Sequence, residues 1–92
     1  MGKFIYRVHA IRRMFERKIT TEDVTSVVSS GKVLESYPDD SPYPSRLLLG
    51  WVGERPLHVV AAEDEVNQQT IIITVYEPGA ERWYHDFERR KK

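Results

Sequence analysis

The chain has 92 residues, which is enough for one domain with a single core and too few for two, so residues 1–92 are expected to form one domain. Its 40% hydrophobic and 30% charged residues exclude a disordered or fibrous chain. The lack of cysteine excludes disulfides, thiolate metal sites and thiol nucleophiles, and it indicates a reducing compartment such as the cytoplasm. No apolar run approaches the roughly 18 residues of a membrane span, and the first residues lack a signal-peptide core, so no membrane association is expected.

Basic residues are concentrated at the two ends of the chain, although 14 basic and 14 acidic residues give a net charge of zero. Residues 1–19 hold six basic residues and one acidic residue, whereas residues 20–66 hold three basic and nine acidic residues. The last four residues, 89–92, are all basic. This asymmetry suggests a local site for a polyanion, whereas composition alone favours the alternative, a solvated helix face with a frayed tail.

Two helices are predicted in the N-terminal third. From Val8 to Lys18 the apolar residues recur with helical spacing, and the basic side chains share the opposite side of the helix. The apolar residues are Val8, Ala10, Ile11, Met14 and Phe15, and the opposite side carries His9, Arg12, Arg13 and Arg17. A second helix is expected to begin after Thr20, an N-cap residue followed by acids in the first turn, and to end at Gly31.

Four strands and a C-terminal helix are predicted after Gly31. The strands are Lys32 to Tyr37, Arg46 to Val52, Leu57 to Glu63 and Thr70 to Tyr76, with short connections that predict an antiparallel meander. Trp83 and Phe87 are spaced i, i+4 within residues 78–92, which favours a short helix packed on the sheet. The expected fold class is therefore α+β: two N-terminal helices packed on a four-stranded antiparallel meander sheet, with a short C-terminal helix.

Strand alternation predicts a polar cluster on one face of this sheet, because successive side chains point to opposite faces. If the helices cover the face of Ile71, Ile73 and Val75, then His58, Tyr76 and Arg46 point to the uncovered face. Loop lengths predict that His58 lies opposite Gly50 on one neighbouring strand and opposite Tyr76 on the other. His58 is a natural proton carrier near neutral pH.

Several segments together resemble one small prokaryotic family of uncharacterised domains. They are His9–Met14, Arg17 with Ile19 and Thr20, Gly31 with Val33–Glu35, Tyr37–Pro38 and Asp40, Pro42 with Pro44–Ser45, Pro56–Val60, and Ile73–Pro78 with Trp83. The family is similar to the RelE/ParE-like toxins, including BrnT-like and MqsR-like ribonucleases. The resemblance implies a RelE-like fold whose sheet face binds RNA.

The resemblance also implies a function: the toxin of a type II toxin-antitoxin system, acting as a metal-independent RNA endonuclease that uses no cofactor. The expected partners are RNA and a cognate antitoxin. The candidate catalytic residues are His58, Tyr76, Arg46 and His9, and the candidate RNA-binding residues are Arg12, Arg13, Arg17, Arg89 and Arg90. Such chemistry needs a base for the ribose 2′-hydroxyl, positive charge for the phosphorane and an acid for the leaving oxygen.

Each candidate has a structural alternative. His58 can be a hydrogen-bonded core histidine, Tyr76 can cap the sheet, and Arg46 can pair with an acid. The spacing of His9, His58 and His85 matches no metal-ligand motif, so no metal site is expected. The competing functions are a non-catalytic module that pairs with an antitoxin or poisons a DNA-handling enzyme, and a housekeeping RNA-binding domain.

Overall fold

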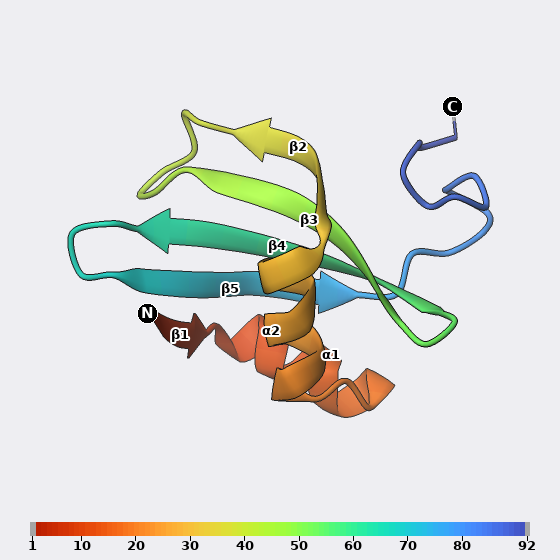
Figure 1. Cartoon of the computed structure of the whole chain (residues 1–92), viewed down its shortest axis with the longest axis horizontal. Coiled ribbons are helices and arrows are strands. Elements are labelled where there is room, and N and C mark those ends of the chain that lie inside the picture. The colour runs from red at the N-terminus through yellow and green to blue at the C-terminus, as the bar shows by residue number, and fades with distance from the viewer. Residues whose placement is uncertain (1, 92) are drawn as a thin grey trace.

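The computed structural model describes residues 2–91 and shows a layer of two helices packed on one face of a curved sheet (Figure 1). The helices and strands follow one another as β1 (Lys3–Tyr6), α1 (Val8–Arg17), α2 (Thr21–Ser30), β2 (Lys32–Tyr37), β3 (Ser45–Val52), β4 (Arg55–Asp64) and β5 (Gln69–Tyr76). The two predicted helices and four predicted strands are all present, with ends shifted by one or two residues. Within residues 2–91, no helix is both long and apolar enough to cross a membrane.

In the described part of the chain the sheet has five strands, in the order β1-β5-β4-β3-β2, and is mixed. The strands β2 to β5 form the predicted antiparallel meander, but β1 pairs in parallel with β5, with Tyr6 opposite Ile72. The predicted four-stranded, all-antiparallel sheet is therefore wrong. The first strand has only four residues, and its partner lies more than sixty residues further along the chain. A parallel pairing over that distance leaves no local sequence signal.

The predicted C-terminal helix is also wrong, because residues 78–91 form turns and one isolated bridge. Phe87 has a left-handed backbone (φ 57°), which no continuous right-handed helix contains. The carboxylate of Asp86 accepts hydrogen bonds from the backbone N–H groups of Glu88 and Arg89, at 3.0 and 3.4 Å. This local bonding favours a turn over a helix. Trp83 and Phe87, although spaced i, i+4, therefore lie in a folded loop and not on one face of a helix.

Helix α2 begins where the sequence predicts. The Thr20 hydroxyl accepts a hydrogen bond from the backbone of Asp23, and the Asp23 carboxylate accepts one from the backbone of Thr20, each at 3.0 Å. This reciprocal capping satisfies two backbone donors that the helix itself leaves unpaired. Gly31 is the C-cap at the predicted position, but its backbone is extended (φ −74°, ψ 168°), so the left-handed conformation expected of a C-cap glycine is not formed.

The core lies between the helices and one sheet face. Its members are Ala10, Met14, Ile19, Val24, Val27, Leu48, Leu57, Val59, Ala61, Ile72 and Val75. Ile72, not Ile71 or Ile73, joins this face, because a bulge between the pairs Val60–Thr74 and Ala61–Ile72 shifts the alternation of β5. The predicted core face of β5 is therefore correct only at Val75. Gly50 also faces the helices, since a Cβ there would lie 2.6 Å from Cγ2 of Val27.

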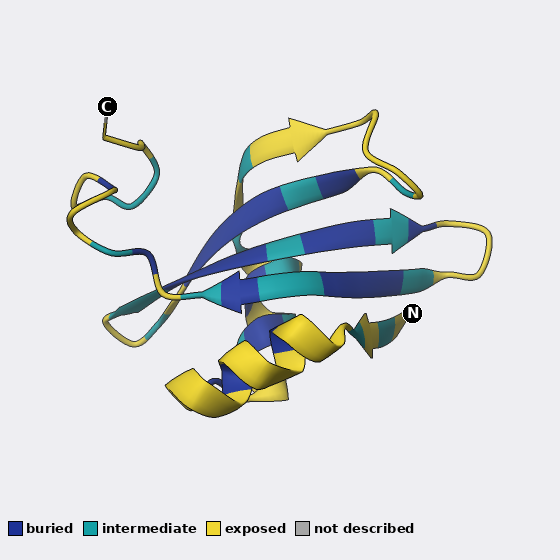
Figure 2. Cartoon of the chain, turned by 180° about the vertical axis from the view of Figure 1, so that it is seen from behind, coloured by how far each residue is buried: buried dark blue, intermediate teal, exposed yellow. Residues whose placement is uncertain are grey.

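Helix α1 buries a narrower face than its sequence pattern indicates. Only Ala10 and Met14 are buried, whereas Val8, Ile11 and Phe15 are exposed. The outward side of α1 in Figure 2 is accordingly almost entirely exposed. The apolar residues predicted to form one buried side of this helix are therefore divided into a buried pair and an exposed row.

Candidate nucleic-acid interface

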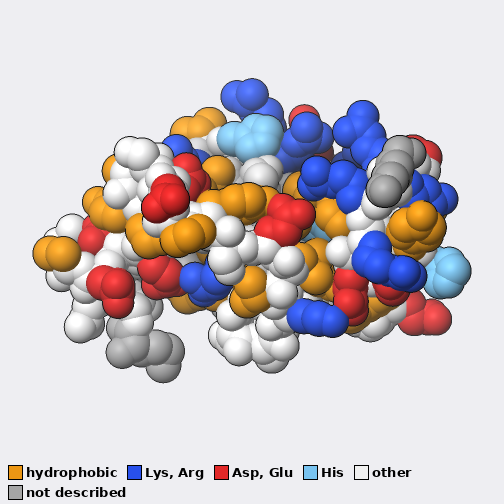
Figure 3. Space-filling view, turned by 90° about the horizontal axis from the view of Figure 1, so that it is seen from above, with side chains coloured by type: hydrophobic (Ala, Val, Ile, Leu, Met, Phe, Trp, Pro, Cys, Tyr) orange, Lys and Arg blue, Asp and Glu red, His pale blue; other side chains and the backbone are white. Residues whose placement is uncertain are grey.

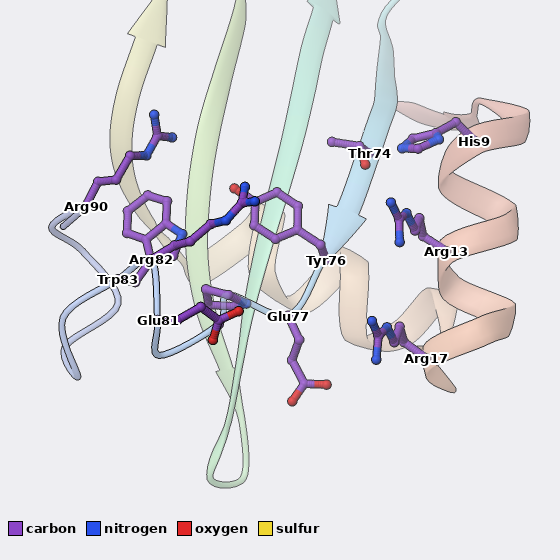
Figure 4. A pocket seen from close by; sticks show the side chains of 12 residues that line it. His9, Arg13, Arg17, Thr74, Tyr76, Glu77, Glu81, Arg82, Trp83 and Arg90 are labelled. Atoms are coloured by element: carbon purple, nitrogen blue, oxygen red, sulfur yellow. The ribbon is translucent and has the colours of Figure 1, made fainter. Parts of the chain in front are cut away.

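A pocket of about 910 Å³ lies where β5 ends, between α1 and the C-terminal segment, residues 78–91 (Figure 4). Side chains from both sides converge on Tyr76, which lies between them in the figure. The lining residues are His9, Arg13 and Arg17 of α1, Thr74, Tyr76 and Glu77 of β5 and its end, and Pro78, Gly79, Glu81, Arg82, Trp83 and Arg90 of the C-terminal segment.

The α1 wall follows from helix periodicity and from the short length of β1. His9, Arg13 and Arg17 are spaced i, i+4 and i+8, so they project from one side of the helix. The last residue of β5 that pairs with β1 is Ile72. Beyond it α1 lies beside β5, and its basic row faces Thr74 and Tyr76 across the pocket (Figure 4).

The opposite wall is a loop closed by backbone hydrogen bonds. The Tyr84 N–H donates to the carbonyl of Arg89 at 2.9 Å, and the Lys91 N–H donates to the carbonyl of Arg82 at 2.7 Å. This closure holds Arg82 and Arg90 on the same side of the pocket. The guanidinium of Arg90 lies 5.0 Å from the ring centre of Trp83, a cation–π contact that further orders it.

His58 and Tyr76 are directly opposite each other on β4 and β5, as the sequence predicts. Nδ1 of His58 lies 3.1 Å from the Tyr76 phenol oxygen, and Nε2 lies 2.8 Å from the carbonyl oxygen of Phe87. Because a carbonyl can only accept a hydrogen bond, Nε2 carries the proton and Nδ1 accepts from the phenol. The ring of Trp83 packs edge-on against the imidazole, with 4.5 Å between ring centres.

Burial keeps both members of this pair neutral. His58 is 0% exposed, and this burial lowers its pKa from the ordinary value of 6.5. The positive charge of Arg90 also lowers the pKa, whereas the hydrogen bond to the carbonyl of Phe87 raises it. Burial likewise raises the pKa of Tyr76 above 10.0. At neutral pH the pocket therefore presents a phenol that is hydrogen-bonded to a neutral imidazole.

The pocket carries excess positive charge, with four arginines and two glutamates in its lining. Arg55 neutralises one of these acids, because its Nε lies 2.9 Å from a carboxylate oxygen of Glu77. The same guanidinium donates to the carbonyls of Arg17 and Lys18, and so it caps the C-terminal end of α1. In Figure 3, Lys and Arg side chains gather on one half of the visible face. A basic, aromatic pocket of this kind suits a phosphodiester ligand.

The structure divides the predicted RNA-binding arginines into two groups. Arg13, Arg17 and Arg90 line the pocket, together with the candidate His9. Arg12 lies outside it, and Arg89 pairs with Asp86 at 3.1 Å. Adjacent arginines thus differ in role because successive residues of a helix or turn point in different directions.

Arg46 does not join His58 and Tyr76. On β3, Arg46 is opposite Ala61 of β4, and Leu49 is opposite His58. Arg46 and Leu49 are three residues apart, an odd number, so their side chains point to opposite faces of the sheet, and Arg46 and His58 therefore lie on opposite faces. The Arg46 guanidinium lies 3.3 Å from the Glu63 carboxylate. The predicted position of His58 opposite Gly50 is also wrong by one residue, because His58 lies opposite Leu49. The predicted cluster of His58, Tyr76 and Arg46 on one uncovered face is therefore not formed. The C-terminal segment covers His58 instead.

Sequence reasoning did not assign Arg82, Trp83 and Arg55 to the site. Arg82 and Trp83 lie on a loop whose path depends on contacts with β4, such as the contact of Trp83 with His58. Arg55 follows a hairpin turn, and nothing near it in the sequence indicates that it caps a distant helix. Within residues 2–91, no group of three or more His, Asp or Glu side chains is arranged to hold a metal ion.

The fold and the pocket define an α+β domain with a basic, aromatic pocket at one end of its sheet. Residues 6–77 match the family described as a domain of unknown function, DUF4258, and the chain belongs to this family. No curated protein and no solved structure matches it. The predicted membership of an uncharacterised family is confirmed, whereas nothing in these matches links the chain to the RelE/ParE-like toxins. The matched residues include the α1 and β5 walls of the pocket and end before the C-terminal wall.

Proposed function

We propose that this protein binds RNA in the pocket beside Tyr76 and cleaves its backbone without a metal ion. The observation that carries the proposal is the pairing of a pocket phenol with a buried neutral imidazole, between two walls that both carry arginines. This arrangement combines a proton acceptor with positive charge, two of the three requirements of backbone cleavage by a ribose 2′-hydroxyl; the third is an acid for the leaving oxygen.

The arginines supply the phosphate site. Arg13 and Arg17 project from α1, and Arg82 and Arg90 project from the opposite wall (Figure 4). Guanidinium groups form paired hydrogen bonds with phosphate oxygens and keep their charge when RNA covers them. A phosphodiester between the two walls would be contacted from both sides, next to Tyr76.

Tyr76 and His58 supply the proton path. The Tyr76 oxygen accepts the proton of the 2′-hydroxyl while the phenol proton passes to Nδ1 of His58, over the 3.1 Å hydrogen bond. A free phenolate is not needed, which agrees with the raised pKa of Tyr76. His58 receives the proton without touching RNA, so it acts through Tyr76 as a positioning residue and proton store.

The bond changes balance as a transesterification. The 2′-oxygen forms a bond to the adjacent phosphorus, and the bond from phosphorus to the 5′-oxygen breaks. His9, from the α1 wall, donates a proton to the leaving 5′-oxygen. The products are a 2′,3′-cyclic phosphate and a 5′-hydroxyl.

The direct test is incubation of the purified protein with RNA in excess EDTA. Wild-type protein should produce 2′,3′-cyclic phosphate ends, and RNA with a 2′-deoxy nucleotide at the cleaved position should stay intact. Tyr76→Phe should slow cleavage at least ~100-fold, since it removes the proton acceptor. Tyr84→Phe is the matched control, because Tyr84 lies on the C-terminal segment but does not line the pocket.

Two results would overturn the proposal that the protein cleaves RNA in this way. Cleavage that persists in Tyr76→Phe would exclude the phenol as proton acceptor. RNA that binds but stays intact at every ratio, with and without ribosomes, would leave the pocket as an RNA-binding interface and favour the non-catalytic module.

We propose the toxin role as the cellular setting of this activity. Expression of the wild-type chain should then arrest growth of a bacterial host, and Tyr76→Phe should relieve the arrest at equal protein level. Arrest that Tyr76→Phe does not relieve would instead favour poisoning through a binding surface. A cognate antitoxin remains a prediction from the sequence resemblance.

A further inference from the structure

We infer that the outward side of α1 is a docking surface for an amphipathic helix of a partner protein, with acidic residues bordering the partner's apolar face. The surface, called the α1 stripe below, consists of Val8, Ile11 and Phe15. It is separate from the pocket and does not depend on the proposed RNA chemistry.

The α1 stripe is a continuous apolar surface in water. Val8 is 71% exposed, Ile11 53% and Phe15 85%, and their i, i+3 and i+7 spacing places them along one side of the helix. Scattered exposed apolar residues are normal, whereas three in one helical row form a connected patch of the kind that partners cover.

The stripe lies outside the hydrophobic core of this chain. Ala10 and Met14 are buried and pack α1 against the core. On another side of the helix, His9, Arg13 and Arg17 line the pocket. The third side carries the exposed Val8, Ile11 and Phe15, and Figure 2 shows exposed residues along most of α1. A helix laid against Val8, Ile11 and Phe15 would therefore leave the pocket wall of α1 in place.

The charges around the stripe select the partner. Arg7, Arg12 and Lys18 are exposed and lie before, beside and after the stripe, and Glu16 is the single acid of α1. Among residues 2–91, the ion pairs that form do not include these three cations. An apolar row bordered by unpaired positive charge is complementary to a helix with an apolar row bordered by Asp or Glu.

A second copy of this chain fits the same surface poorly. A two-fold contact would place the stripe against itself and would bring the same cations of both copies together. That juxtaposition is repulsive, whereas an acidic helix gains attraction from the cations before, beside and after the stripe. The length of the stripe, two helical turns from Val8 to Phe15, also matches a helix laid along it.

The test uses two synthetic 18-residue helical peptides with the same leucine row, one bordered by Glu and the other by Lys. The Glu peptide should bind the wild-type chain, and Phe15→Ser should weaken this binding at least 10-fold. Val66→Ser is the matched control, because Val66 is 92% exposed but lies in the turn before β5, far along the chain from α1. Circular dichroism of each variant should match that of the wild type, since the changed side chains are exposed.

The alternatives give distinct readings. Equal binding of the two peptides, or binding of neither, would overturn the inference. A dimer that sedimentation detects in the wild type and Phe15→Ser abolishes would assign the stripe to a second copy instead. Binding to anionic phospholipid vesicles with no binding of the Glu peptide would assign it to a membrane surface. RNA affinity of Phe15→Ser should equal that of the wild type, which separates this inference from the proposed function.

Discussion

The imidazole of His58 fixes the phenol of Tyr76 in the pocket while it is itself held by the backbone of Phe87. The two hydrogen bonds, of 3.1 and 2.8 Å, use both ring nitrogens, so a single residue of β4 connects β5 to the C-terminal segment. The buried histidine is therefore structural and, through Tyr76, chemically connected to the pocket. Its surroundings lead to the first prediction.

The free energy of unfolding should fall on acidification because of His58. Burial lowers the pKa of the folded state below the 6.5 of an unfolded histidine, so the unfolded chain binds more protons between these two values. The contribution of His58 to stability is complete above pH 6.5, decreases as pH falls below it, and levels off below the pKa of the folded state. Urea unfolding between pH 8 and pH 5 measures this slope.

The control for this measurement is the exposed His9. His9→Gln should keep the slope, and His58→Gln should reduce it while lowering stability at neutral pH, because two buried hydrogen bonds are disturbed. An unchanged slope in His58→Gln would show that other groups cause the acid dependence.

RNA affinity should distinguish Arg13 from its neighbour Arg12. Arg13 lines the pocket and Arg12 does not, although the two have equal charge. Arg13→Ala should weaken binding and reduce the slope of log affinity against log salt by about 0.7, the value of one lost phosphate contact on single-stranded RNA. Fluorescence anisotropy over a salt series measures both. Equal losses in the two variants would indicate a diffuse charge effect instead of the pocket.

Gly50→Ala should destabilise the fold by about 1–3 kcal/mol through overpacking. A Cβ at this position would lie 2.6 Å from Cγ2 and 3.1 Å from Cα of Val27, so α2 and β3 would have to separate. Denaturant unfolding measures the loss. Val27→Ala in the Gly50→Ala background makes room for the methyl group, and the double variant should be more stable than the sum of the single losses predicts. If the stability losses of the two single variants add strictly, the close contact between position 50 and Val27 is contradicted.

Thr20→Ala should cost about 1 kcal/mol, since it removes the hydroxyl that caps α2. The next residue provides a matched control. Among residues 2–91, the Thr21 side chain bonds only to the exposed carboxylate of Glu22, so Thr21→Ala should change stability little. Thermal or urea unfolding of the two variants checks the difference. Equal losses would show that helix propensity, not capping, dominates at this end.

The sequence alone determined the features that depend on neighbours in the chain. Apolar spacing located both helices and four of the five strands, and Thr20 was identified as an N-cap because its hydrogen-bond partner is three residues away. These features depend on residues only a few positions apart. The pairing of His58 with Tyr76 was also predicted correctly, but two deviations cancel: the connection between β4 and β5 is one residue shorter than predicted, and the bulge in β5 shifts the register by one residue in compensation.

Only the tertiary structure decided which side chains share a face and which form the pocket. One bulge in β5 moved Ile72 into the core, and the register of β3 and β4 separated Arg46 from His58. The parallel pairing of β1, the exposed stripe on α1 and the loop over His58 depend on contacts between segments far apart in the chain. Such contacts are set by the packing of the whole molecule, because a local sequence pattern specifies the spacing of apolar residues but not the surface that covers them.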